Sequence, residues 1–311
     1  MPARIVIIIV TYNRSALLRE CLSAVLRQTV APAAVVLVDN HSTDDTPAVA
    51  QSFAAADDRV HPFRTPSNLG GAGGYAWGIR CAAAFSPDAV WLMDDDTVCA
   101  PDALAELLQA AGRVGEYGFL AGRVLWTDGT PCRMNVPLFA GGEEYGLPRL
   151  RKATFVSLLI PWRVVEQVGL PIAEFFIWGD DQEYTDRISR RWPCYYAAQS
   201  VAVHKTASNH GSDLVRDDAD RIDRYRYKYR NELYISRRTG VLSLGYYAWR
   251  ALGDAVRILL VSDRKARRLA VLWQGVRSGL SFAPRVQKLE SPANPTQGEP
   301  IRYAQPSERN L

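Results

Sequence analysis

The distribution of apolar residues predicts buried strands that alternate with amphipathic helices in the first part of the chain. Unbroken apolar runs occupy residues 5–10, 34–38 and 89–93, and such runs are typical of strands covered on both faces. Residues 15–28 carry leucine and valine at helical spacing, and a second helix is expected to run toward Ala56. Strands and helices that alternate in this way indicate βαβ units and a parallel central sheet.

The pattern continues less regularly in the second part of the chain. Residues 119–126 and 154–160 predict further strands. The stretch 129–151 between them is rich in Gly, Pro and Glu, and we expect it to be a loop that shapes a cleft. Residues 242–280 carry apolar and aromatic side chains at three- or four-residue steps, which predicts helices.

Charge divides the chain into parts. Residues 1–215 carry 18 basic against 23 acidic side chains, a net charge of −5, whereas residues 216–280 carry 15 against 7, a net charge of +8. Residues 281–311 contain repeated Pro, Gln, Ser and Asn, a composition typical of disorder. We therefore expect an α/β domain over 1–215, a basic helical region over 216–280 and a disordered tail over 281–311.

Composition argues against several classes of protein. The five cysteines are scattered and form no CxxC pair, which favours a reducing compartment and disfavours a disulfide framework or structural zinc. The first residues lack the long apolar region of a signal peptide, and no uncharged apolar run approaches the roughly 18–20 residues that span a bilayer. We therefore expect a cytoplasmic protein.

Three consecutive carboxylates, Asp94, Asp95 and Asp96, follow the third apolar run. Ligands of open α/β sheets bind beyond the carboxyl ends of the strands, where these acids would lie. Because side chains alternate along an extended segment, Asp94 and Asp96 share one face and can converge on one ligand. A divalent ion that bridges to a diphosphate would offset their repulsion, and oxygen ligands suit Mg²⁺ or Mn²⁺. On this triplet alone, a solvated acidic turn is an equally good interpretation.

A glycine-rich segment, residues 68–74, enters the helix that precedes the acidic triplet. Its glycines match neither GxGxxG nor GxxxxGK[ST], which disfavours a dinucleotide oxidoreductase or an ordinary ATPase. Glycines at a helix entrance still let backbone N–H groups approach phosphate oxygens. We therefore expect phosphate or ribose contact here, and a tight turn with close helix packing is the alternative.

A second acidic group follows a bulky apolar stretch and comprises Asp180, Asp181 and Glu183, beside Trp178. A carboxylate near other acids and an aromatic side chain tends to have a raised pKa, which suits a general base. Taken alone, a helix N-terminus with acids in its first turn is the better interpretation. His204 ends a late apolar strand, and without other context such a histidine is more often a core or surface residue than a metal ligand.

Five segments taken in order resemble the inverting family 2 glycosyltransferases, which have a GT-A fold: residues 10–14, 38–44, 68–74, 94–96 and 178–183. The glycine segment, the triple aspartate and the Trp-x-Asp-Asp-x-Glu segment look most similar to bacterial galactofuranosyltransferases of the initiating type, which act on a lipid-linked acceptor. The resemblance covers about residues 5–210. Residues 225–238 are similar to the Tyr- and Arg-rich segment that follows the catalytic domain in related rhamnosyl- and galactofuranosyltransferases.

The resemblance implies a role for each matching residue. The uracil and ribose would be bordered by Thr11, Tyr12 and Asn13. Asp39 would accept a hydrogen bond from the uracil. The nucleotide-sugar would face Asn68, Gly70, Gly71, Gly73, Asp94 and Asp95. The metal and the diphosphate would lie at Asp94 and Asp96, with His204 completing the coordination. Asp181 matches the catalytic base, Asp180 and Glu183 would bind acceptor or sugar hydroxyls, and Trp178 would pack on a sugar face.

The function implied is a metal-dependent inverting hexosyltransferase that moves galactofuranose from UDP-galactofuranose to a polyprenyl-linked saccharide in cell-envelope polysaccharide synthesis. It would work at the cytoplasmic face of the inner membrane. One alternative is a dTDP-rhamnose-dependent rhamnosyltransferase. A noncatalytic nucleotide-sugar-binding or scaffolding protein is an alternative of another class, as is a nucleotidyltransferase, for which Arg14 is the one nearby basic candidate.

The basic helical region has two open interpretations. Apolar side chains such as Tyr246 and Trp249 recur on one helix face beside arginines that include Arg250 and Arg257, a pattern that suits a helix lying on an anionic membrane. The same residues also fit helices packed on the catalytic domain with solvated or paired arginines. Nucleic-acid binding is disfavoured because no DNA- or RNA-binding motif accompanies the charge.

Overall fold

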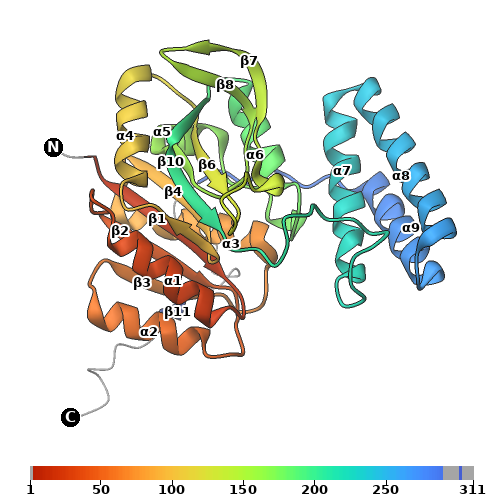
Figure 1. The fold of residues 1–311 in the computed structure, drawn as a ribbon, viewed down its shortest axis with the longest axis horizontal. Coiled ribbons are helices and arrows are strands. Elements are labelled where there is room, and N and C mark those ends of the chain that lie inside the picture. The colour runs from red at the N-terminus through yellow and green to blue at the C-terminus, as the bar shows by residue number, and fades with distance from the viewer. Residues whose placement is uncertain (1–2, 290–300, 303–311) are drawn as a thin grey trace.

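The computed structural model describes residues 3–289 and 301–302 (Figure 1). An α/β domain is built around a mixed sheet with the strand order β11-β3-β2-β1-β4-β9-β6-β10-β8-β7, in which β11 (Ile301–Arg302) is the strand beside β3. Three helices, α7, α8 and α9, stand to one side of this domain (Figure 1).

The predicted parallel strands form one half of the sheet. Strand β1 (Ile5–Thr11) pairs in parallel with β2 (Ala34–Asp39) and with β4 (Ala89–Asp94), and β2 pairs in parallel with β3 (Val60–Arg64). All residues of β1 and β2 are buried, which confirms that these strands are covered on both faces.

Helices cover both faces of the sheet. Alternate β1 residues, such as Ile7 and Ile9, join a core with α1 (Ser15–Leu26), α2 (Thr46–Ala56) and α4 (Ala103–Val114). The intervening residues, such as Ile8, join a second core with α3 (Gly70–Ala82), α5 (Trp162–Val168) and α6 (Asp180–Ser189).

The other half of the sheet contains antiparallel pairs. Strand β9 (Leu158–Pro161) lies antiparallel between β4 and β6 (Leu120–Leu125), and β10 (Tyr195–His204) runs parallel to β6. Strand β9 is shorter than the predicted 154–160, because Ser157 has a positive φ of 57° that interrupts the extended backbone.

The prediction of a loop over residues 129–151 is wrong for the second half of that stretch. Strands β7 (Leu138–Glu144) and β8 (Leu147–Lys152) form an antiparallel hairpin there. The two connecting residues, Tyr145 and Gly146, have φ values of 57° and 73°, which suits the left-handed two-residue turn that matches the twist of a hairpin.

Two strand ends bring the predicted metal ligands together. Strand β4 ends at Asp94, and the chain turns through Asp95 and Asp96 into β5 (Thr97–Cys99). Strand β5 pairs antiparallel with β10, so that Thr97 lies opposite His204. The acidic turn therefore lies beside the end of β10.

The helical region comprises α7 (Tyr225–Thr239), α8 (Val241–Val261) and α9 (Lys265–Ser281), which share a small core. No helix among the described residues is long and apolar enough to cross a membrane. Residues 282–289 return to the α/β domain, where the Leu170 N–H donates to the carbonyl of Gln287 at 2.8 Å. The expected disordered tail therefore does not include these residues, whereas 290–300 and 303–311 lie outside the described part.

Candidate active site

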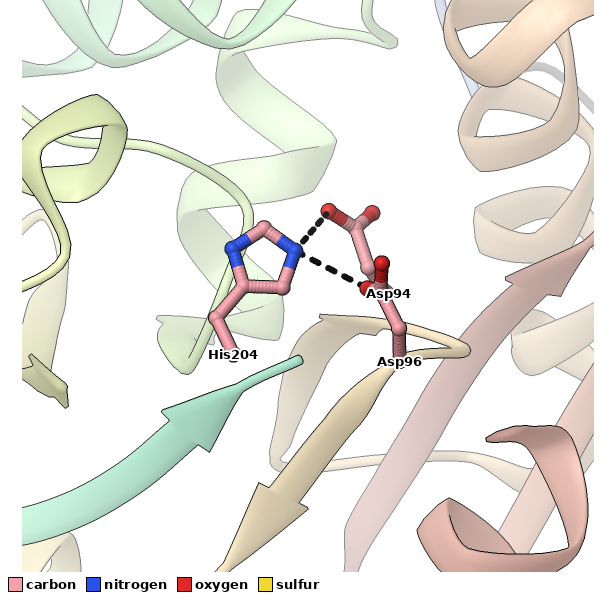
Figure 2. A group of neighbouring side chains, drawn as sticks. All are labelled: Asp94, Asp96 and His204. Carbon is pink, nitrogen blue, oxygen red and sulfur yellow. Dashed lines mark ion pairs between the residues drawn. The ribbon is translucent and has the colours of Figure 1, made fainter. Parts of the chain in front are cut away.

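Asp94, Asp96 and His204 form a compact cluster of potential metal ligands (Figure 2). One ligand atom from each lies within 4.8 Å of the others, and Nε2 of His204 is 2.9 Å from Oδ1 of Asp96 and 3.7 Å from Oδ2 of Asp94. Asp96 and His204 are buried, whereas Asp94 is partly exposed. Oδ1 of Asp96 has no well-aligned hydrogen-bond donor among the described residues. A set of two carboxylates and one imidazole, in which this oxygen is still free to bind a ligand, fits a divalent cation.

The imidazole of His204 is oriented by Asn135. Nδ1 of His204 lies 2.7 Å from Oδ1 of Asn135, whose amide nitrogen donates to Oγ1 of Thr154 at 2.9 Å. Because the amide oxygen accepts, Nδ1 carries a proton and Nε2 is the nitrogen that faces the acids. Burial alone would lower the pKa of His204, but the neighbouring Asp96, Cys132 and Asp94 side chains raise it to about 10.

Arg14, at the start of α1, contacts Asp95 and Asp96 of the triplet. Its Nη1 donates to Oδ1 of Asp95 at 3.2 Å and to Oδ2 of Asp96. Burial raises the pKa of Asp95 to about 7, although the charge of Arg14 opposes this. Burial also acts to raise the pKa of Asp96, but His204 and Arg14 outweigh it and the pKa is lowered. Asp96 is therefore the stable anion of the triplet.

Tyr75 is a site residue that the sequence reasoning missed. Its side chain is buried on α3, and its hydroxyl donates to Oδ1 of Asp94 at 2.6 Å. This bond leaves Oδ2 of Asp94 as the oxygen on the His204 side. Burial and the charge of Asp96 raise the pKa of Asp94. Only the position of Tyr75, directly after the glycine segment, could have suggested this contact.

The second acidic group lies in the first turn of α6. Burial raises the pKa of Asp181 to about 6; the N–H of Gln182, donating to Asp181 Oδ1 at 2.7 Å, opposes the shift, and the charge of Asp94 adds to it. Burial and then Asp181 raise the pKa of Asp180 well above its usual range, and Asp94 again contributes. Asp94 thus lies near enough for its charge to act on both acids.

Residues predicted to border the nucleoside lie at the ends of β1 and β2. Tyr12 is 41% exposed, whereas Thr11 and Asp39 are buried. The side-chain oxygen of Asn13 accepts from the Thr43 N–H at 2.7 Å, and Oδ1 of Asp39 accepts from the Ser42 N–H at 2.8 Å. Tyr12 and Asn13 are therefore the exposed members of this set, and the base contact of Asp39 stays a prediction.

Packing explains part of the glycine segment. Gly70 has a φ of 70°, and a Cβ there would lie 2.0 Å from the carbonyl oxygen of Phe176. A Cβ at Gly73 would meet Leu69 at 2.6 Å, whereas one at Gly71 would have no described atom within 4 Å. Asn68 accepts from the Gly70 N–H at 2.8 Å. Gly71 is therefore the glycine with space for a ligand, and the others shape the turn.

Asn40, a second residue that the sequence reasoning missed, ties the end of β2 to the glycine segment. Its amide nitrogen donates to the Gly70 carbonyl at 2.9 Å, and its oxygen accepts from the Leu69 N–H at 2.9 Å. Nothing in the sequence besides its position after Asp39 pointed to this role.

Trp178 and Glu183 are held by protein contacts. The ring of Trp178 lies 4.9 Å from that of Tyr225 on α7. Both carboxylate oxygens of Glu183 accept from Arg187, at 3.0 and 2.8 Å. Their predicted contacts with sugar or acceptor stay predictions.

The chain is similar in sequence to known glycosyltransferases. A model of glycosyl transferase family 2 matches residues 6–156. Galactofuranosyltransferase GlfT1 of Mycobacterium tuberculosis is 26% identical over 297 residues, which cover 89% of this chain and 94% of that protein. Galactofuranosyltransferase GlfT1 of Mycolicibacterium smegmatis is 29% identical over 199 residues, covering 59% and 64%.

Solved glycosyltransferases share the fold. A mannosyltransferase of Pyrobaculum calidifontis, solved with GDP-Man and Mn²⁺, aligns with a TM-score of 0.56 at 16% identity over 90% of this chain and 88% of that one. S. aureus TarS 1–349, solved with UDP, aligns with a TM-score of 0.54 at 14% identity over 90% and 72%. These likenesses confirm the predicted GT-A fold.

Proposed function

We propose, from the premise that this chain is a hexosyltransferase with a family 2 domain, that it transfers galactofuranose from a UDP donor to a lipid-linked saccharide with inversion. The observation that carries the proposal is the Asp94, Asp96 and His204 cluster, whose Asp94 is near enough for its charge to act on Asp181. The names of the relatives, both galactofuranosyltransferases, support the choice of sugar.

Asp94, Asp96 and His204 are the residues that would hold a divalent cation, Mn²⁺ or Mg²⁺. When bound, such a cation supplies Lewis-acid stabilisation of negative charge on a departing diphosphate. The half-exposed Arg14 adds a fixed positive charge beside the same acids. Tyr12, exposed at the end of β1, is placed to contact the nucleoside.

Asp181 is the proposed general base. With a pKa of about 6 it is ionised at neutral pH yet more basic than an ordinary aspartate. It accepts the proton of the acceptor hydroxyl while that oxygen forms a bond to the anomeric carbon and the bond from that carbon to the diphosphate breaks. Attack from the face opposite the leaving group inverts the anomeric configuration.

A donor screen tests this proposal. We expect the purified protein to transfer sugar from UDP-galactofuranose to a short prenyl-linked disaccharide in the presence of Mn²⁺ or Mg²⁺. UDP-galactopyranose and dTDP-rhamnose are the controls, because the first changes only the ring form of the sugar and the second changes both the sugar and the base. Faster transfer from dTDP-rhamnose would replace the proposed sugar, and donor binding without any product would contradict an enzymatic role.

We propose that the outer face of α8 contacts the membrane in which such an acceptor is anchored. Apolar side chains recur there at three- or four-residue steps and all are exposed: Leu242, Tyr246, Trp249, Leu252, Val256 and Leu259. The opposite face of α8 packs on the other helices through Tyr247 and Ile258. An aromatic and aliphatic stripe of this kind suits a helix that lies in the membrane interface, here at the cytoplasmic face of the inner membrane.

Several arginines of the helical region form ion pairs, which weakens the argument for attraction to anionic lipid. Arg257 contacts Asp213 at 2.8 Å and Asp254 at 3.1 Å. Arg267 pairs with Asp223 at 2.6 Å, and the buried Arg268 pairs with Asp263. Because these three arginines are held in ion pairs, we propose that membrane contact depends mainly on apolar insertion.

A further inference from the structure

The residues that precede the proposed base adopt an unusual backbone. Phe176 and Trp178 have φ values of 64° and 65°, and Gly179 has 87°. Side chains with a Cβ rarely adopt a positive φ, so such residues persist where their surroundings hold them in place. Helix α6 begins at Asp180, directly after this segment. The direction in which Asp180 and Asp181 point therefore depends on what holds residues 175–179.

A single side chain of α7 contacts three carbonyl groups of this segment. Nδ2 of the fully buried Asn231 lies 2.9 Å from the oxygen of Phe175, 3.1 Å from that of Ile177 and 2.8 Å from that of Trp178. Oδ1 of Asn231 accepts from Nε of Arg230 at 3.0 Å. Both ends of the amide are therefore used, and its donor end serves the segment before the base.

The same segment abuts the donor side of the site. The carbonyl oxygen of Phe176 accepts from the Ala72 N–H at 3.2 Å, and it occupies the space that a Cβ at Gly70 would need. Ala72 lies in the first turn of α3, the helix whose Tyr75 donates to Asp94. Residues 175–179 thus lie between Asn231 on one side and the helix that contacts the metal-ligand cluster on the other.

We propose that Asn231 is a positioning residue: it holds residues 175–179 in the backbone that presents Asp181 to the Asp94, Asp96 and His204 cluster. This inference rests on the proposed role of Asp181. It assigns the helical region a part in the active site through α7, in addition to the membrane contact of α8.

The Asn231→Asp substitution tests the contact between the side-chain amide and the three carbonyl groups. The substitution keeps the size of the side chain and the oxygen that Arg230 contacts, and it replaces the N–H donor by an acceptor that opposes three carbonyls. Tyr229→Phe is the matched control on the same helix, because it removes a 2.8 Å hydrogen bond to Asp254 of α8 without touching residues 175–179.

We expect kcat for sugar transfer to fall at least about tenfold in Asn231→Asp, since a misplacement of about 1 Å can cost roughly 100-fold. The KM for the nucleotide-sugar should change less than about threefold, because the donor side keeps its contacts. Amide hydrogen exchange of residues 176–183 should accelerate. Tyr229→Phe should leave kcat and this exchange unchanged.

Wild-type kcat together with unchanged exchange in Asn231→Asp would overturn the inference, as would an equal loss in Tyr229→Phe. If Asn231→Asp does not fold, Asn231→Ala leaves the carbonyls without an opposing charge, and the same expectations apply to it. Absence of transfer by the wild-type protein would count against the proposed function alone, because the exchange measurement tests the positioning independently of activity.

Discussion

Nδ1 of His204 lies 2.7 Å from Oδ1 of Asn135, and this contact determines which ring nitrogen faces Asp94 and Asp96. A histidine that binds metal through one nitrogen commonly donates from the other to an oxygen, which fixes its tautomer. We expect Asn135→Ala to weaken Mn²⁺ binding about 10–100-fold, the range typical for such partners. Titration calorimetry with the metal alone measures this. Met134→Ala, the exposed neighbour, should bind normally, and unchanged affinity in Asn135→Ala would contradict the orienting role.

The convergence of Asp94, Asp96 and His204 could be predicted, and the role of Asn135 could not. Alternation along an extended segment places Asp94 and Asp96 on one side, and the family resemblance supplies His204. Asn135 comes from the stretch predicted as a loop, where no periodic pattern fixes the position of a side chain. Its amide is tied to Thr154, which follows it only after the β7–β8 hairpin.

Replacing the proposed base should separate chemistry from donor binding. Asp181→Asn keeps the size of the side chain and removes the proton acceptor, so kcat should fall about 10²–10⁴-fold, the usual contribution of general-base catalysis. The dissociation constant for the nucleotide-sugar with Mn²⁺ should stay within about threefold, as calorimetry can show. Asp186→Asn, which changes an acid of α6 paired with Arg151 and Arg190, is the control. Near-normal turnover in Asp181→Asn would rule out the assignment.

The pH dependence of transfer should report the same carboxylate. Burial raises the pKa of Asp181 to about 6, and the ionised form is the one that can accept a proton. Activity should therefore be constant above about pH 7 and fall about tenfold per pH unit well below pH 6. The measurement is kcat/KM for the acceptor at saturating donor. A midpoint near 4, the value of an exposed aspartate, would show that Asp181 is not the titrating group.

Local pattern predicted the buried strands and the helical periodicity of the C-terminal region, but it could not separate packing from function in the glycine segment. Gly70 is required by the Phe176 carbonyl, which lies more than one hundred residues later in the chain. In the same way, the net charge of residues 216–280 suggested attraction to anionic lipid. Asp213, which lies outside that range, pairs with Arg257, so a charge counted over a fixed range misses a partner that the fold supplies.

The exposed stripe of α8 makes a prediction that distinguishes apolar insertion from charge attraction. If Trp249 and Leu252 insert, the protein should bind neutral phosphatidylcholine vesicles almost as well as anionic ones, with little loss at high salt. Trp249→Ser and Leu252→Ser should each weaken vesicle binding at least about tenfold in a flotation assay, because a buried apolar side chain contributes about 1.5–3 kcal/mol. Trp273→Ser is the matched control, since it removes an equally exposed tryptophan of α9 outside the stripe. Binding that requires anionic lipid and disappears with salt would instead assign the contact to the basic side chains.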